Sequence, residues 1–148
     1  MSAPGTELAA LWLHKAQNDL VTGEQTLLLP DGPTDTVCFH AQQAAEKALK
    51  ALLTAHESTA PRGHDLLRLL DLATEHLPEL AGFRAPLAQM TAYAVEVRYP
   101  GDWIEPSREE AAAALGDARE VVRAVREGLG LLGPPGTTPA PPAPRSGR

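Results

Sequence analysis

The chain has 148 residues and a formal net charge of −6, and aromatic residues make up only 4% of its composition. This length supports one hydrophobic core, and the predominance of alanine and leucine favours close helix packing over sheet formation, so we predict an all-α domain. The acidic balance excludes broad nonspecific binding to nucleic acid, but it is compatible with a local basic pocket.

The cysteine content and the hydropathy pattern exclude further classes of protein. A single cysteine, Cys38, excludes an intrachain disulfide and a cysteine-based metal cluster, and its apolar surroundings predict a small core side chain. No charged segment followed by an apolar stretch opens the chain, and no run of about 18 apolar residues occurs. The sequence therefore predicts a cytoplasmic protein without a membrane segment, and it indicates no metal or cofactor.

The first two predicted helices form a hairpin. The first spans about residues 6–28 and is ended by the turn residues 30–33, which include two prolines and a glycine. Thr34 or Asp35 is expected to cap a second helix that continues to about residue 56. Because the connection is short, we expect the two helices to lie antiparallel.

The second helix is predicted to bury one broad side and to keep its polar residues in stripes. Its alanines and leucines fill one arc when the residues are spaced at the helical period, so this helix needs neighbours on at least two sides. On the opposite arc lie His40, Gln43 and Lys47, and the lone His and Lys are expected to be solvated. Gln42 and Glu46 lie at the boundary, one turn apart, where they either hydrogen-bond to neighbouring helices or line a cleft.

Two shorter helices are predicted in the middle of the chain. Asp65 is expected to cap a third helix that is apolar almost all round and is therefore mostly buried. A proline and a glycine interrupt the chain before a fourth helix over about residues 83–95, in which Leu87 and Met90 point inward. Residues 98–103 are then expected to form a turn or loop.

The last helix has the strongest local signals. Ser107 and Glu110 form a predicted capping box at its start. Apolar residues then recur at alternating steps of four and three, the pattern of a helix with one buried side: Ala111, Leu115, Ala118, Val122, Val125 and Leu129. The proline-rich end of the chain has no such period. We expect a disordered start over residues 1–6, a helical domain over residues 7–130 and a disordered tail over residues 131–148.

Several segments, taken in order, resemble the HEPN domain family over about residues 8–129. The most specific are the pattern Gln-Gln-x-x-Glu-Lys-x-x-Lys that starts at Gln42, the His-Asp-Leu sequence at His64 and the Arg-Tyr-Pro sequence at Arg98. The segment of residues 16–20 and the closing amphipathic helix complete the resemblance. It implies an up-and-down bundle of four main helices plus a short additional helix.

The resemblance also implies partners and an activity. Members of this family are commonly homodimers and are often encoded beside a minimal nucleotidyltransferase as a toxin and antitoxin pair. Many are metal-independent endoribonucleases that use an arginine and a histidine with four to six residues between them. Here no arginine has a histidine at that spacing, and the corresponding positions after Arg98 hold Trp103, Ile104 and Glu105. The chain therefore resembles the branch associated with nucleotide binding or with a nucleotidyltransferase partner.

Within this branch, the resemblance implies a nucleotide site made of His40, Gln43, Lys47, Arg98 and Tyr99. Arg98 would hold a phosphate, and Tyr99 would stack on a base or donate its hydroxyl. Lys47 and His40 would add positive charge from the second helix. The alternatives are a structural salt bridge for Arg98 and simple packing for Tyr99.

Asp19, Gln42 and Glu46 are expected to be structural residues of the same cleft, and Asp19 or Glu46 is the expected partner of Arg98 in the salt-bridge alternative. The predicted site requires Arg98 and the polar residues of the second helix to lie around one recess. This convergence is the expectation on which the predicted site depends.

Two other functions stay open at the level of the sequence. One is a metal-independent endoribonuclease toxin with an altered active site, in which Arg98 acts with Tyr99, His64 or Asp102 as the proton carrier. The other is a non-catalytic scaffold whose apolar helix faces serve a homodimer. The ligand is a nucleotide or RNA in the first two cases, and the sequence does not name the base.

Overall fold

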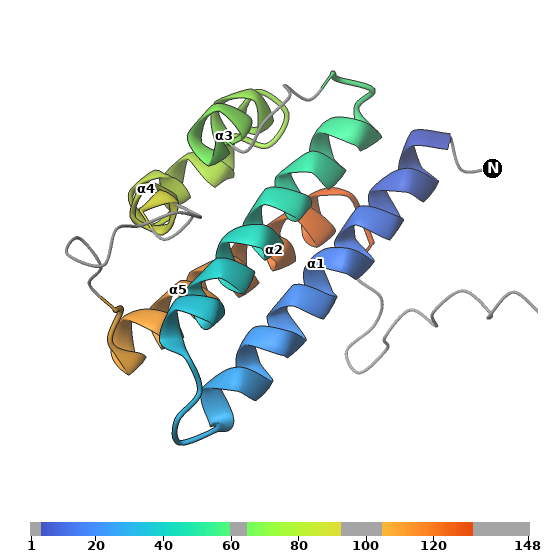
Figure 1. Cartoon of the computed structure of the whole chain (residues 1–148). Coiled ribbons are helices and arrows are strands. Elements are labelled where there is room, and N and C mark those ends of the chain that lie inside the picture. The colour runs from blue at the N-terminus through green and yellow to red at the C-terminus, as the bar shows by residue number, and fades with distance from the viewer. Residues whose placement is uncertain (1–3, 60–64, 93–104, 132–148) are drawn as a thin grey trace, which may run out of the picture.

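The computed structural model describes residues 4–59, 65–92 and 105–131, and all of its regular elements in these ranges are helices (Figure 1). The long helices are α1 (Pro4–Leu28), α2 (Thr34–Ala55) and α5 (Arg108–Gly128). Between α2 and α5 the chain forms α3 (Leu66–Thr74), the 3₁₀ segment η1 (Pro78–Phe83) and α4 (Arg84–Thr91). The predicted all-α fold is confirmed. None of the helices in the described ranges combines the length and apolarity needed to cross a membrane.

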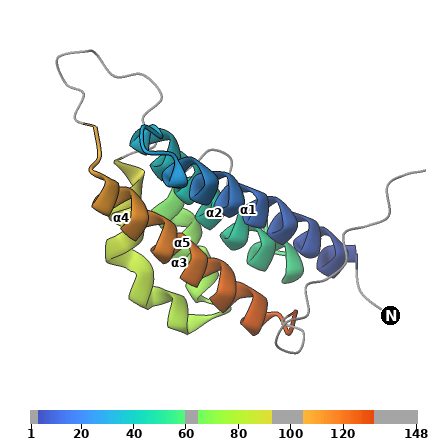
Figure 2. The same ribbon diagram turned by 90° about the horizontal axis from the view of Figure 1, so that it is seen from below.

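Helix α2 lies at the centre of the bundle and contacts α1, α3, α4 and α5. In Figure 1, α1 runs beside it on one flank and α3 and α4 lie on the other; Figure 2 shows α1 and α2 together over α5. The predicted need for neighbours on at least two sides is therefore confirmed. Small buried side chains keep α2 narrow enough for these neighbours to approach: Ala41, Ala44, Ala45, Ala48 and Ala51.

Helices α1 and α2 form the predicted antiparallel hairpin (Figure 1). Leu13, Ala16 and Leu20 make up the buried side of α1. The helix begins at Pro4, so residues 4–6 are helical and the predicted disordered start does not extend over them. Proline suits a helix start because its fixed φ is already helical and its missing N–H has no partner to lose there.

The prediction that Thr34 or Asp35 caps α2 is wrong. The N-cap residue is Pro33, which makes no side-chain bond to the helix. The Thr34 hydroxyl instead donates to the carbonyl oxygen of Pro106 at 2.6 Å, and the Asp35 carboxylate accepts the N–H of Thr36 at 2.9 Å. Thr34 and Pro106 are 72 residues apart, so local sequence gives no sign of this partner.

The short helices follow the predicted order with different lengths. Asp65 caps α3 as predicted, since its carboxylate accepts the N–H of Arg68 at 3.2 Å. Helix α4 buries Leu87 and Met90 as predicted, but it ends at Thr91, before the expected end at residue 95. The interruption before it is a 3₁₀ segment with proline at its start, a common use of such short turns.

Helix α5 confirms the predicted capping box. The Ser107 hydroxyl accepts the N–H of Glu110, and the Glu110 carboxylate accepts the N–H of Ser107, both at 3.0 Å. The predicted inward positions are buried, except for Leu129, which is partly exposed just after the helix. The local signals at this end of the chain were therefore sufficient to place the helix.

A clasp of side-chain to backbone bonds ties one end of the bundle, and it consists of Arg108 and Thr34 with their carbonyl partners. The Arg108 guanidinium donates to the carbonyl oxygens of Leu27 and Leu29, the latter at 3.2 Å. These carbonyls lie at the end of α1, where backbone acceptors have no partner within the helix. The other bond of the clasp runs from the Thr34 hydroxyl to the carbonyl oxygen of Pro106. The clasp therefore joins the hairpin turn to the start of α5.

Cys38 is fully buried on α2, as its apolar surroundings predict. Burial raises the pKa of its thiol to about 11, and the carboxylates of Glu110 and Asp35 add to this shift. A thiol with so high a pKa is almost entirely protonated near neutral pH, so Cys38 behaves as a small apolar side chain.

We predict that Gly32→Ala strongly destabilises the fold. Gly32 lies in the turn between α1 and α2, and a Cβ atom there would lie 1.9 Å from the carbonyl oxygen of Thr26. This oxygen belongs to the backbone of α1, so relief of the clash requires the turn to move. A loss of about 2 kcal/mol or more in the free energy of unfolding is expected in urea titrations.

Gly116→Ala in α5 is the matched control. No atom lies within 4 Å of the Cβ position at Gly116. The higher helix propensity of alanine should raise the free energy of unfolding by about 0.5–1 kcal/mol. A Gly32→Ala protein as stable as the unsubstituted chain would contradict the turn geometry.

Candidate functional site

Three of the predicted site residues meet across the α1–α2 hairpin. The Asp19 carboxylate, on α1, lies between two side chains of α2: its Oδ1 is 2.9 Å from His40 Nδ1, and its Oδ2 is 2.5 Å from Lys47 Nζ. The Asp19 side chain is 11% exposed, and those of His40 and Lys47 are each 24% exposed. We call these three residues the Asp19 cluster.

Helix geometry explains how the cluster forms. His40 and Lys47 are seven residues apart, about two helical turns, and therefore lie on one face of α2. Helix α1 runs antiparallel beside α2 (Figure 1), and its Asp19 contacts both residues. Gly23 permits a close approach nearby, since a Cβ there would lie 2.6 Å from Leu115 Cδ2 and 3.7 Å from His40 Cβ.

The Asp19 carboxylate determines which atoms the other two residues present to a ligand. An ionised carboxylate only accepts hydrogen bonds, so His40 Nδ1 carries the proton of this bond and Nε2 is the ring nitrogen left to exchange a proton. The Lys47 ammonium has three N–H donors, of which Asp19 accepts one. The cluster therefore presents a cation and a proton-transfer group on the same helix face.

A pair of glutamines continues this face of α2. Gln43 is three residues after His40 and four before Lys47, a spacing that places all three side chains together. Its Nε2 donates to Gln42 Oε1 at 3.1 Å. Gln42 is 1% exposed, and its own Nε2 has no hydrogen-bond partner among the described residues. This buried donor is an exception to the rule that buried polar groups are paired.

Glu46 and Lys50 add an ion pair one turn further along α2. The Glu46 carboxylate is buried and accepts Lys50 Nζ at 3.1 Å. Lys50 Nζ also lies 5.5 Å from the centroid of the Trp12 ring on α1, a cation–π geometry. Sequence reasoning did not assign Lys50 or Trp12 to the site. The spacing of four residues from Glu46 was a usable signal for Lys50. The contact of Trp12 with Lys50 depends on the relative axial position of α1 and α2, which the sequence does not give.

The structure corrects one prediction about this face. His40 and Lys47 were expected to be solvated, but both side chains are partly buried and paired with Asp19. Asp19 and the two boundary residues, Gln42 and Glu46, are buried beside the polar face. Their role in ligand binding stays a prediction.

The rest of the predicted site falls on segments that the structure does not describe. The predicted phosphate ligand and base platform, and the candidate proton carriers of the ribonuclease alternative, all lie outside the described residues: His64, Arg98, Tyr99 and Asp102. The expected salt bridge from Arg98 to Asp19 or Glu46 lies outside them for the same reason. The described part of the site is therefore the contribution of α1 and α2.

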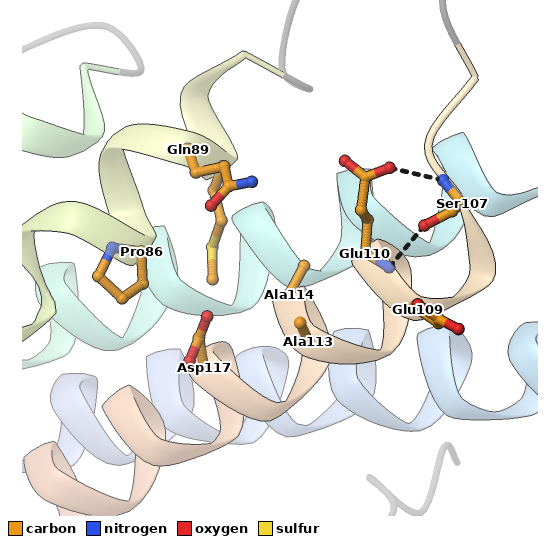
Figure 3. A pocket seen from close by; sticks show the side chains of 9 residues that line it. Pro86, Gln89, Ser107, Glu109, Glu110, Ala113, Ala114 and Asp117 are labelled. Carbon is orange, nitrogen blue, oxygen red and sulfur yellow. Dashed lines mark hydrogen bonds between the residues drawn. The ribbon is translucent and has the colours of Figure 1, made fainter.

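A separate pocket of about 240 Å³ opens between α4 and α5 (Figure 3). Gln89, Ser107, Glu109, Glu110 and Asp117 supply its polar lining, and no lysine or arginine is among the described residues that line it. Burial raises the pKa of Asp117 above its ordinary value. No three His, Cys, Asp or Glu side chains in the described ranges are placed to share a metal ion. An acidic pocket of this kind disfavours a phosphate.

Comparison with known protein families gives one match. The model of the HEPN domain matches residues 9–128, a range that contains the Asp19 cluster and both glutamines. Nothing matches the chain in the comparisons with curated proteins and with solved structures. The resemblance identified from the sequence is confirmed by the family match.

We predict that Asp19 and Lys47 are energetically coupled. A double-mutant cycle with Asp19→Asn and Lys47→Gln should give a coupling of about 1–2 kcal/mol in the free energy of unfolding, because a partly buried charged hydrogen bond is screened less than one at the surface. The matched pair is Glu24 and Arg119, which are 2.6 Å apart but 44% and 51% exposed. Its coupling should be below about 0.5 kcal/mol. Equal couplings for the two pairs would mean that burial adds nothing at Asp19.

Proposed function

Because the chain belongs to the HEPN domain family, we propose that it is the nucleotide-binding component of a pair formed by a HEPN domain and a minimal nucleotidyltransferase, of the toxin and antitoxin type. The nucleotide binds on the face of α2 that holds the Asp19 cluster. The observation that carries this proposal is the single carboxylate of Asp19, which holds His40 and Lys47 side by side while part of each side chain is exposed.

The hydrogen-bond donors of the cluster favour a phosphate as the bound group. Asp19 accepts one hydrogen bond from His40 and one from Lys47, which leaves the other N–H groups of the Lys47 ammonium for a ligand. A phosphate carries more acceptor oxygens than a carboxylate, and it can accept the remaining N–H donors of Lys47 and a proton from His40 Nε2. Asp19 already orders both side chains, so less conformational entropy is lost when the phosphate binds.

The charge of the whole chain favours a small ligand over a long nucleic acid. The formal net charge of −6 repels a polyanion, and the favourable contacts are concentrated in one cluster of the described residues. A mononucleotide gains those contacts without placing further phosphates over the acidic surface. This argument supports nucleotide binding ahead of the ribonuclease alternative.

We predict that purified protein binds ADP in calorimetric titrations and that Lys47→Gln weakens binding by about tenfold or more. A hydrogen bond to a charged group contributes about 1.5–3 kcal/mol, and a factor of ten in affinity corresponds to about 1.4 kcal/mol. Glutamine keeps a donor for Asp19, which limits the structural damage.

Lys15→Gln is the matched control for this experiment. Lys15 is exposed on α1, so its substitution removes the same charge without touching the cluster. Circular dichroism should show native helicity for both variants. If folded Lys47→Gln protein binds ADP as tightly as the unsubstituted chain, the cluster is not the phosphate site. If no nucleotide binds at all, the proposal is lost.

Exposed apolar side chains on α1 support protein partners as part of the same proposal. Leu8, Leu11, Val21 and Leu28 are all exposed. Their spacing places them along the outward side of α1, away from its buried leucines. HEPN domains commonly dimerise, and we propose that this side of α1 contacts a second copy of the chain. The nucleotidyltransferase would then bind the homodimer.

Light scattering during size exclusion should give the mass of a homodimer, and a co-expressed nucleotidyltransferase encoded beside the chain should elute with it. Leu11→Glu is expected to shift the chain toward the monomer, because a buried charge in an apolar interface has no partner. Gln89→Glu adds the same charge at an exposed polar position of α4, on the other side of α2 from α1, and should leave the mass unchanged. A monomeric parent chain, or a nucleotidyltransferase that elutes alone, would refute the corresponding part of the proposal.

A further inference from the structure

The buried amide of Gln42 is the unusual group on the polar face of α2. Its side chain is 1% exposed, its Oε1 accepts a hydrogen bond from Gln43, and its Nε2 donates to nothing among the described residues. A buried N–H without a partner costs free energy that a methionine of similar volume would avoid. A residue that lowers stability in this way calls for a function that depends on its remaining hydrogen bond.

The remaining hydrogen bond fixes the orientation of the Gln43 amide. One N–H of Gln43 Nε2 is held by Gln42 Oε1 at 3.1 Å. The second N–H and the Oε1 of Gln43 have no partner among the described residues, and Gln43 is only partly buried. An amide held in this way keeps one donor and one acceptor for a ligand.

Gln43 lies next to the residues that are proposed to hold the phosphate. It lies on the same face of α2 as His40 and Lys47, between them in the sequence. A nucleotide whose phosphate binds the Asp19 cluster therefore has its remaining groups within range of the α2 side chains nearby. The base is the part of a nucleotide that a neutral donor and acceptor pair recognises.

We propose that Gln43 recognises the base of the bound nucleotide, that Gln42 is its positioning residue, and that the preferred base is adenine. This inference rests on the nucleotide binding proposed above. Adenine presents a donor, the N6 amino group, next to an acceptor, N7, which complements the amide Oε1 and N–H of a glutamine. The same edge of guanine presents two acceptors, so the Gln43 Oε1 would face O6 without a hydrogen between them.

The test compares ADP, GDP and pyrophosphate, which has no base, in calorimetric titrations. The unsubstituted chain should bind ADP roughly 5- to 150-fold more tightly than GDP, the range of a bidentate base contact. Gln43→Ala should bring the ratio of the two affinities close to one and leave the affinity for pyrophosphate unchanged within about twofold, since its phosphate contacts lie at Lys47 and His40.

Gln42→Met tests the positioning role. It keeps the side-chain volume and removes the unpaired donor, so the melting temperature should stay the same or rise. The ratio of ADP to GDP affinity should nevertheless fall, because the Gln43 amide is then free to rotate. A purely structural Gln42 would give the opposite pair of results, a lower melting temperature with an unchanged ratio. Gln25→Ala, an exposed glutamine of α1, is the control and should change neither quantity.

The outcomes separate this inference from the proposed function. If ADP and GDP bind equally tightly and Lys47→Gln weakens both, nucleotide binding survives and base recognition by Gln43 is overturned. If Gln43→Ala keeps the full preference for ADP, the preference has another source and the inference fails. If neither nucleotide nor pyrophosphate binds, both proposals fail together.

Discussion

The close packing of α2 between its neighbours is the constraint on which the rest of the structure depends. Fully buried alanines along α2 let other helices approach its axis, and α1, α3, α4 and α5 all contact it. A helix surrounded in this way has little surface left for polar residues. Between His40 and Lys50 the polar residues lie opposite the apolar arc or at its edge, and His40, Lys47 and Lys50 contact Asp19 or Trp12 of α1. The packing that builds the core therefore also determines where the polar residues of α2 lie.

This confinement changes the chemistry of ordinary side chains. A lysine and a histidine on an open helix surface are solvated and mobile, but beside Asp19 they are partly buried and share one carboxylate. Desolvation strengthens their attraction to Asp19, and the fixed geometry keeps their free donors on one side. Gln42 shows the cost of the arrangement, because its Nε2 is buried without a partner among the described residues. Polar groups held at such a cost are typical of sites that bind a ligand.

The sequence predicted the features that depend on neighbours along the chain. The capping box at Ser107 and Glu110, the cap at Asp65 and the polar stripe of α2 each involve residues within one or two turns. It failed for Thr34, whose hydroxyl bonds to a carbonyl 72 residues away instead of capping its own helix. It also failed to pair Asp19 with His40 and Lys47, because that contact depends on the relative axial position of two helices. Helical periodicity gives the face of a residue but not the residue opposite it.

The clasp at the hairpin turn bears on the order in which the bundle assembles. The bonds of Asp19 join residues 21 and 28 positions apart, within one hairpin, whereas Arg108 reaches carbonyls 79 and 81 positions away. Short-range contacts close smaller loops and lose less chain entropy, so we expect the hairpin to form early and α5 to dock later. The geometry around Asp19 then arises in the first stage of folding. When α5 docks, the Asp19 cluster between α1 and α2 has already formed.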